Sequence, residues 1–227
     1  MARDGTATRK AIMDAAQALI LETGFAATTV DAVIARAGIT KGTFFYHFKT
    51  KADLALALVQ RDAMHDAALL EANMARAEAL SRDPLQQILI CMGLYEEELG
   101  KLTAPYPGCL YASFIYEAQL FDDNTLRVTR AVFSDWTARI MGKLEEVMRL
   151  YRPRLPVDLK TLAEMSLVQA EGAYILSKVQ HDPKAVAAQF RHYRNYLELL
   201  FMPADSAATQ NSGSVKPALL DAGAAPA

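Results

Sequence analysis

Residues 38–51 read GITKGTFFYHFKTK, a segment that combines small residues, lysines and aromatic residues. The lysines would be costly on a core helix, and three phenylalanines and a tyrosine are unusual on an ordinary surface helix. Phe44 or Phe45, together with Phe48, can face inward and hold a short helix on its neighbours. The segment therefore predicts a short helix with one packed face and one basic face.

Two short helices are predicted around this segment, joined by the turn AGIT at residues 37–40. Thr28 is expected to cap the first helix, in a capping box with Asp31, and Gly38 is expected to end it. Thr40 is expected to cap the second helix. A longer helix precedes both, so the first 47 residues predict three helices with a Gly-containing turn between the last two. That is a helix-turn-helix arrangement.

The distribution of charge separates this segment from the rest of the chain. Residues 1–51 hold seven basic and four acidic side chains, a net charge of +3. The whole chain carries −2, so the remainder carries −5. A basic N-terminal quarter on an acidic body predicts two tasks, one of them with an anionic partner.

The rest of the chain keeps a helical pattern, which predicts an all-α fold of about nine helices. Residues 109–121 are apolar on nearly every side, as in a buried helix. The Ala-, Ser-, Gly- and Pro-rich residues 203–227 are expected to form a flexible tail. Beyond the first three helices, the sequence predicts helices at about 51–76, 83–101, 109–121, 124–150, 158–181 and 183–201.

Composition and motifs argue against several other classes of protein. Of the 227 residues, 52% are hydrophobic, enough for a sizeable core, but no apolar run is long enough to predict a membrane span or a membrane partner. There is no signal-peptide pattern, and two cysteines are too few for a disulfide framework, so a cytoplasmic location is expected. The four histidines have no metal-ligand spacing and no catalytic signature is present, so neither an enzyme nor a cofactor is expected.

The stretch TTVDAVIARAGITKGTFFYHFKTKADL, residues 28–54, resembles the helix-turn-helix of the TetR family of bacterial transcriptional repressors. The likeness is specific over residues 8–54 and elsewhere extends only to helix number and length. It implies a helix-turn-helix DNA-binding domain at residues 1–50 and a helical effector-binding and dimerisation domain at 51–202. A weaker likeness, in GCLYASFIYEA (108–118) and EGAYILSK (171–178), is to a branch that includes regulators of detoxification and reductase genes.

The resemblance implies that the second short helix enters the major groove of double-stranded operator DNA. Gly42 would let the backbone approach the DNA closely, and Lys41 would reach a phosphate or a guanine edge. For the threonines, helix capping alone is the alternative. A helical adaptor that has lost DNA binding is another, although it would not need these lysines and small residues. The expected DNA-binding residues are Thr28, Thr29, Thr40, Lys41, Gly42, Thr43, Tyr46, His47 and Lys51.

The resemblance further implies a homodimer that reads two half-sites of a palindromic operator, with residues 158–201 forming the interface. Gly172 and Ala173 would allow close approach of helices. An apolar seam would supply contact area, although it could also pack within its own subunit. The seam consists of Val186, Phe190, Tyr193, Leu197 and Leu200.

The body is also expected to bind a small apolar or electrophilic effector that releases the DNA, with helix 51–76 as the lever. Cys109 follows Gly108 at a helix start, where backbone N–H groups lower a thiol pKa, so an electrophile- or redox-sensing repressor acting through Cys109 is the alternative. Most apolar candidates would serve as core in either case, and activation instead of repression remains open. The expected wall residues are Met92, Tyr95, Cys109, Phe114, Trp136, Met165, Gln169 and Tyr174.

Overall fold

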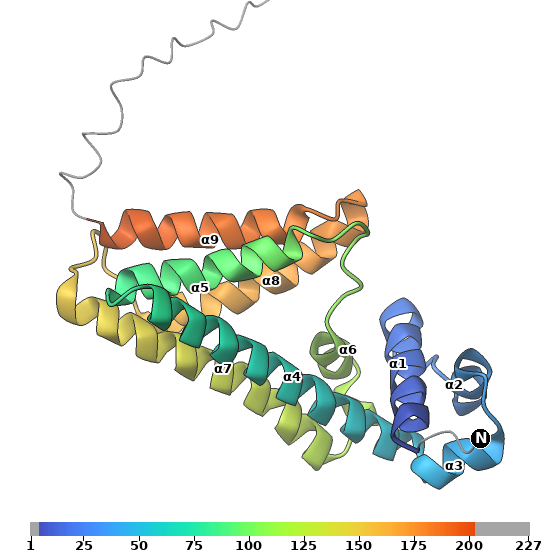
Figure 1. The fold of residues 1–227 in the computed structure, drawn as a ribbon. Helices are drawn as coiled ribbons and strands as arrows, with labels where there is room; N and C mark the ends of the chain where they lie inside the picture. The colour runs from blue at the N-terminus through green and yellow to red at the C-terminus, as the bar shows by residue number, and fades with distance from the viewer. Residues whose placement is uncertain (1–4, 203–227) are drawn as a thin grey trace, which may run out of the picture.

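The helices form a small N-terminal group, α1 to α3, at one end of a longer helical body (Figure 1). The computed structural model describes residues 5–202, and this range holds nine α-helices, one 3₁₀ helix and no strand, so the predicted all-α fold is confirmed. The predicted tail at 203–227 lies outside the described residues. The elements are α1 (Gly5–Thr23), α2 (Val30–Ala37), α3 (Lys41–His47), α4 (Lys51–Leu80), α5 (Pro84–Leu99), α6 (Leu110–Tyr116), η1 (Ala118–Leu120), α7 (Asp123–Leu150), α8 (Leu159–Gln180) and α9 (Ala185–Phe201).

The N-terminal group is built around Phe44 and Phe48, which are 0% and 2% exposed. They pack with apolar residues of α1 and with the start of α4. The same core continues into α6, which contributes Leu110, Tyr111 and Phe114. The N-terminal group therefore packs directly on the body.

Helix α4 joins the two parts because it belongs to both cores. Its first turns, from Leu54 to Val59, pack in the N-terminal core, and Leu70, Met74 and Ala77 pack in the body. A capping box fixes its start, since Thr50 accepts from the Asp53 amide and the Asp53 carboxylate accepts from the Thr50 amide. Figure 1 shows α4 and α7, which contact each other, running from the body toward the N-terminal group. Among the described helices, none combines the length and apolar character needed to cross a membrane.

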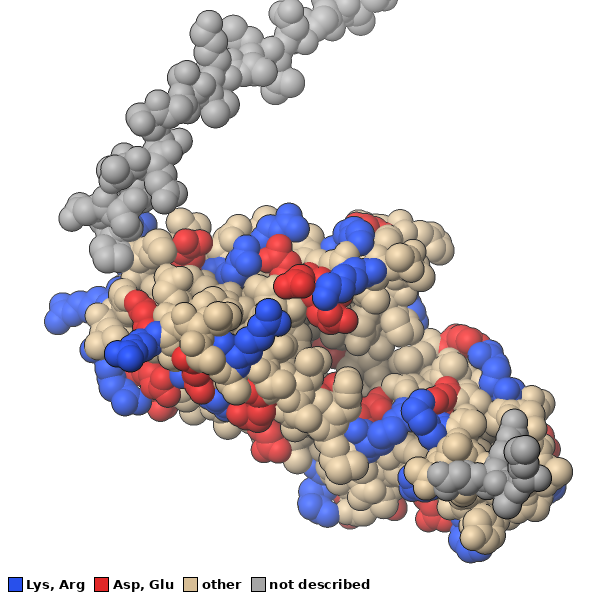
Figure 2. Space-filling model, viewed as in Figure 1, with Lys and Arg blue, Asp and Glu red and all other residues tan. Residues whose placement is uncertain are grey.

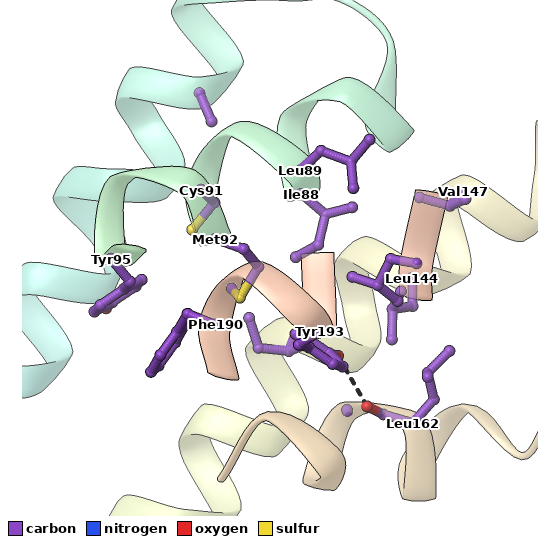
Figure 3. Packing of buried hydrophobic residues seen from close by; sticks show 14 of the residues in the cluster. Ile88, Leu89, Cys91, Met92, Tyr95, Leu144, Val147, Leu162, Phe190 and Tyr193 are labelled. Carbon is purple, nitrogen blue, oxygen red and sulfur yellow. Dashed lines mark hydrogen bonds between the residues drawn. The ribbon is translucent and has the colours of Figure 1, made fainter. Parts of the chain in front are cut away.

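The body core overturns one prediction, because the apolar seam of α9 packs inside its own subunit. Figure 3 shows Phe190 and Tyr193 among Met92, Tyr95 and other core residues, with the Tyr193 hydroxyl donating 2.9 Å to the Leu162 carbonyl. A stripe of apolar residues predicts that a helix face is buried but does not say against what. The seam residues Val186, Phe190, Tyr193, Leu197 and Leu200 are all at most 5% exposed without a second chain.

Three local predictions also require correction. The N-cap of α2 is Thr29 rather than Thr28, and its hydroxyl accepts from the Ala32 amide at 3.1 Å. Helix α7 begins at Asp123, one residue before the predicted start at 124, and is capped by Asp122. The segment 109–121 is not one buried helix: α6 ends at Tyr116, which is 80% exposed, and η1 follows. In the first two cases a neighbouring residue with a suitable side chain caps the helix. In the third, a short 3₁₀ helix forms where the pattern suggested a continuous helix.

Candidate nucleic-acid interface and ligand cavity

The turn between α2 and α3 is fixed by Gly38. This residue has φ of 64°, a left-handed conformation that favours glycine. Its amide donates to the Ile34 and Ala35 carbonyls, and the Ile39 amide donates to the Ile34 carbonyl at 3.2 Å. These bonds end α2 with a Schellman-type cap and direct the chain into α3. Thr40 then caps α3, accepting from the Thr43 amide at 3.2 Å.

Helix α3 presents a polar face to the surroundings while Phe44 lies on its buried face. Lys41, Gly42 and Tyr46 are exposed, and the Tyr46 side chain is 78% exposed. A Cβ at Gly42 would meet only the Thr40 hydroxyl, at 3.9 Å, so the outer side of the helix start is open. An exposed lysine and tyrosine beside a glycine suit close approach to a phosphate backbone and groove.

The structure does not bring all the predicted DNA-binding residues to this face. Thr28 is 3% exposed and its hydroxyl donates to the Gly24 carbonyl at 2.8 Å. Lys51 lies over the Phe25 ring, with its amine 4.0 Å from the ring centroid, and donates to the Phe25 carbonyl. Burial lowers the pKa of Lys51, an effect that the negative charge of Glu117 opposes. The exposed residues of the predicted set are Thr29, Thr40, Lys41, Gly42 and Tyr46, while Thr43 and His47 are half-buried.

A cavity of about 560 Å³ lies between α1 and the body, a size typical of small-molecule sites, which are roughly 300–1,000 Å³. Figure 2 shows a hollow in the molecular surface between these two parts, with acidic side chains visible inside it. Helices α1 and α4 to α9 all contribute to its wall. The wall is rich in aromatic residues, which are Tyr95, Tyr106, Tyr111, Phe133, Trp136, Tyr174 and Phe190.

Half of the predicted wall residues line this cavity. Tyr95, Cys109, Trp136 and Tyr174 do, and the Trp136 indole donates to the Ser166 hydroxyl at 2.9 Å. The other four do not. Met92 and Phe114 are 0% exposed and serve as core, and Met165 packs against the body core. Gln169 lies outside the wall, with its side-chain oxygen buried and without a hydrogen-bond partner.

The sequence analysis missed a set of polar residues on α4 that forms one side of the cavity. Asp62 and Asp66 both line it, as do Arg61 and His65. A signal was present, because residues four apart lie on the same helix face, and this pattern places two acidic side chains together. The Asp66 carboxylate accepts from the Tyr111 hydroxyl at 2.7 Å. Burial raises the pKa of Asp66, although the hydrogen bond from Tyr111 opposes this.

Cys109 is positioned as predicted, at the start of a helix, but its thiol is not activated. It is the N-cap of α6, and its sulfur accepts from the Ala112 amide at 3.4 Å. Burial raises the pKa of the thiol, and the nearby Glu171 carboxylate raises it further. These effects outweigh the hydrogen bonds from the helix start, so the expectation of a lowered pKa is wrong. The cysteine remains a wall residue of the cavity.

Two contacts connect the cavity region to the N-terminal group. The carboxylate of Glu117, one residue after α6, accepts from the Phe25 amide at 2.8 Å and from the Ala26 amide at 2.7 Å. The Lys178 amine of α8 donates to the Leu21 carbonyl at 3.1 Å. These bonds link the end of α6 and α8, two helices that line the cavity, to α1 and the loop that follows it.

Comparisons with known proteins agree with this architecture. Residues 12–58 match the sequence model of the bacterial regulatory proteins, tetR family. The chain is 24% identical over 186 residues to an uncharacterised HTH-type transcriptional regulator in the lacX 3′ region of Lactococcus lactis, covering 81% of this chain and 89% of the relative. It is 24% identical over 182 residues to the transcriptional regulator AcuR of Cereibacter sphaeroides, covering 80% and 81%.

A solved structure shares the whole fold. The TetR-family transcriptional regulator from Agrobacterium tumefaciens superposes with a TM-score of 0.70 and 23% identity, over 88% of this chain and 100% of that one. The sequence match covers the three N-terminal helices and the start of α4, and the structural match extends through the body. Residues 12–58 are therefore similar to the helix-turn-helix of the tetR family of bacterial regulatory proteins, and the chain has the fold of a solved TetR-family regulator.

Proposed function

We propose that the protein is a ligand-responsive transcriptional repressor that binds a palindromic operator as a homodimer and releases it when a small molecule enters the cavity. The observation that carries this proposal is that one helix connects the helix-turn-helix with the cavity. Helix α4 packs beneath the helix-turn-helix and also lines the cavity. A ligand that favours one position of α4 would therefore change the position of α3.

The DNA-binding part of the proposal rests on the exposed face of α3. Lys41 and Tyr46 would contact phosphates or base edges, and Thr29 and Thr40 would contribute hydroxyls beside backbone N–H groups of helix starts. Lys51 is better assigned to positioning the loop at Phe25 than to the DNA, because its amine is already engaged there.

The dimer part rests on α8 instead of the α9 seam. Val168, Gly172, Ile175 and Val179 recur at spacings of four and three and so lie on one face of α8. The three apolar side chains are 69%, 58% and 72% exposed, and a Cβ at Gly172 would meet nothing within 4 Å. On α9, Leu199 is 63% exposed. An exposed apolar face with a glycine suits close packing against the same face of a second copy.

Sensing of electrophiles through Cys109 is the less favoured form of the proposal. The residue lines the cavity, but burial raises its thiol pKa and so lowers the fraction of reactive thiolate. The likeness of GCLYASFIYEA (108–118) to one branch of the family is likewise a proposal about ancestry and not about chemistry. A reversible ligand in the cavity is favoured.

The test is fluorescence anisotropy with the DNA that flanks the protein's own gene, measured over a series of salt concentrations. A repressor of this kind would bind with high affinity that falls steeply with salt, because lysines displace counterions from phosphates. The DNA that binds should contain a palindromic pair of half-sites whose spacing fits a dimer. Binding that is weak and independent of sequence would contradict the proposal.

A further inference from the structure

We infer that the cavity selects organic cations, molecules that join a positively charged nitrogen to an aromatic or other apolar group. This deepens the proposed function by naming a class of effector, and its role as an effector rests on that function. The inference comes from the charges and rings of the wall. Five acidic side chains line the cavity, against two basic ones.

The two basic side chains are already engaged at the α1 side of the cavity. Arg61 bonds to Asp14 at 2.8 Å and to Asp62 at 3.1 Å, and Lys10 bonds to Asp14 at 2.7 Å. A third acidic residue, Glu98, pairs with Lys101 at 3.0 Å. The two basic side chains of the wall are thus used by these carboxylates, and the nearby Lys178 amine is engaged by the Leu21 carbonyl.

Asp66 and Glu171 remain without a lysine or arginine partner among the residues that the structure describes. Asp66 accepts from the Tyr111 hydroxyl, and Glu171 lies beside the Cys109 thiol. His65, next to Asp66 along α4, is the weakest of the influences on the Asp66 pKa. Two half-buried carboxyl groups with only neutral hydrogen-bond partners are costly as anions, and a ligand cation would remove that cost.

The two carboxyl groups line the same cavity although they come from different helices. Tyr106 lines it with them. Tyr106 stacks on Tyr174 with ring centroids 4.1 Å apart. A cation in this region would therefore have both carboxylates and aromatic rings around it.

The aromatic residues of the cavity wall fit the aromatic or apolar group of such a ligand. Tyr95 meets Trp136 edge to face at 5.4 Å and stacks with Phe190 at 5.6 Å. Ring faces attract cations, and the rings also provide the apolar surface that an aromatic group buries. An anionic ligand would face Asp66 and Glu171 without a basic side chain to receive it, and a neutral ligand would leave both carboxyl groups unpaired.

The test uses two probes of the same shape, phenyltrimethylammonium and its uncharged isostere tert-butylbenzene. Trp136 is the single tryptophan of the chain and lines the cavity, so its fluorescence reports binding directly. The full-length protein is titrated with each probe. We expect saturable binding of the cation and at least about tenfold weaker binding of tert-butylbenzene, the scale of one charge interaction across a partly hydrated site.

Charge-removing variants of similar shape locate the effect. Asp66→Asn and Glu171→Gln should each weaken binding of phenyltrimethylammonium about tenfold and leave tert-butylbenzene unchanged. Glu164→Gln is the control, since Glu164 is on α8 but outside the cavity wall and pairs with Lys160. Equal or tighter binding of tert-butylbenzene, or cation binding that neither cavity variant weakens, would overturn the inference.

These titrations contain no DNA, so they separate the inference from the proposed function. A protein that binds operator DNA but prefers tert-butylbenzene keeps the repressor proposal and loses the cation inference. A protein that prefers the cation but binds no operator keeps the selectivity of the cavity and loses its regulatory role. Addition of phenyltrimethylammonium to the DNA complex then completes the test, with release of the DNA as the expected result.

Discussion

The Glu117 carboxylate accepts a hydrogen bond of 2.8 Å from the backbone amide of Phe25, which lies 92 residues away in the sequence. Its second oxygen receives the Ala26 amide at 2.7 Å. The chain turns here between α1 and α2, and Gly24, with φ of 88°, makes room for the carboxylate. This bond therefore ties the loop before the helix-turn-helix to the end of α6.

Substitution of Gly24 tests that contact. Gly24→Ala would place a Cβ 2.8 Å from the nearer carboxylate oxygen of Glu117, at a backbone conformation that side chains disfavour. We expect a loss of about 1–3 kcal/mol in the free energy of unfolding. The control is Gly142→Ala in α7, where a Cβ meets nothing within 4 Å and the helix should gain about 0.5–1 kcal/mol. Urea unfolding measures the free energy of unfolding of both variants. A Gly24→Ala variant as stable as Gly142→Ala would show that Glu117 imposes no constraint.

Lys41 and Lys51 should behave differently although both lie in the segment that first predicted DNA binding. Lys41→Ala should reduce the slope of log affinity against log salt by about 1, because one phosphate contact is lost. Lys51→Ala should instead lower stability by about 1–2 kcal/mol, since its amine packs on Phe25. Anisotropy and thermal unfolding distinguish the two, with Lys160→Ala on α8 as the control for loss of charge alone. A Lys51 variant that is fully stable but weak in DNA binding would reverse the assignment.

The exposed face of α8 predicts how the proposed dimer can be broken. Ile175→Asp should raise the dissociation constant at least about 30-fold, because a charge would be buried in the apolar centre of the interface. Leu150→Asp is the matched control, since Leu150 is 69% exposed near the end of α7. Sedimentation velocity over a range of protein concentrations measures both. An equally strong effect of the control, or none of Ile175→Asp, would place the interface elsewhere.

Both cysteines should react slowly with N-ethylmaleimide in the folded protein. Burial raises the pKa of the Cys91 thiol to about 12, and it also raises the pKa of Cys109 well above its ordinary value. At pH 7.5 we expect alkylation at least about tenfold slower than in the urea-unfolded chain, since the thiolate is the reactive form. Mass spectrometry over time gives the rates for each cysteine. Rapid modification of Cys109 alone would restore the electrophile-sensing alternative.

The raised pKa of Asp66 predicts a dependence of stability on pH. In the folded state this carboxyl keeps its proton to higher pH than in the unfolded chain, so the native state binds more protons in that interval. Stability should therefore fall as pH rises from the ordinary carboxyl pKa near 4 through the raised value. Asp66→Asn removes this loss. The thermal midpoint of the variant, relative to that of the wild type, should therefore rise as pH increases from 4 to 7.

Asp122 supplies a control of opposite sign. It caps α7 by accepting from the Thr125 amide at 2.7 Å, and this hydrogen bonding lowers its pKa. Its contribution to stability is present above the unfolded pKa and is lost as pH falls. The Asp122→Ala midpoint should therefore fall further below that of the wild type as pH rises. Parallel pH profiles for the two variants would contradict both assignments.

The helix-turn-helix could be predicted because its determinants are local. Gly38 must adopt a left-handed conformation, Thr40 must cap a helix, and Phe44 and Phe48 must face inward. Each requirement is visible in a few adjacent letters. The capping residue of α2 was wrong by one position because Thr28 and Thr29 are chemically equivalent candidates. Only the packing of the loop shows that Thr28 is buried and bonded to Gly24.

The cavity was predicted only in part and the packing of the α9 seam was predicted wrongly, since both depend on contacts between distant segments. The seam of α9 is apolar whether it faces its own core or a second chain, and its sequence does not distinguish these. Phe114 and Met92 were reasonable wall residues for the same reason, and both proved to be core. The acidic residues of the cavity wall come from separate helices, and no pattern within α4 or α8 shows that Asp66 and Glu171 line one space.

The continuity of the N-terminal core with Leu110, Tyr111 and Phe114 has a consequence for building hybrid regulators. A module transplanted at the boundary near residue 50 would leave these side chains against a surface that did not evolve with them. A functional chimera would have to carry α6 and Glu117 together with the donated helix-turn-helix, or redesign that seam. The unit of exchange is thus larger than the segment proposed to read an operator, and it includes part of the cavity wall.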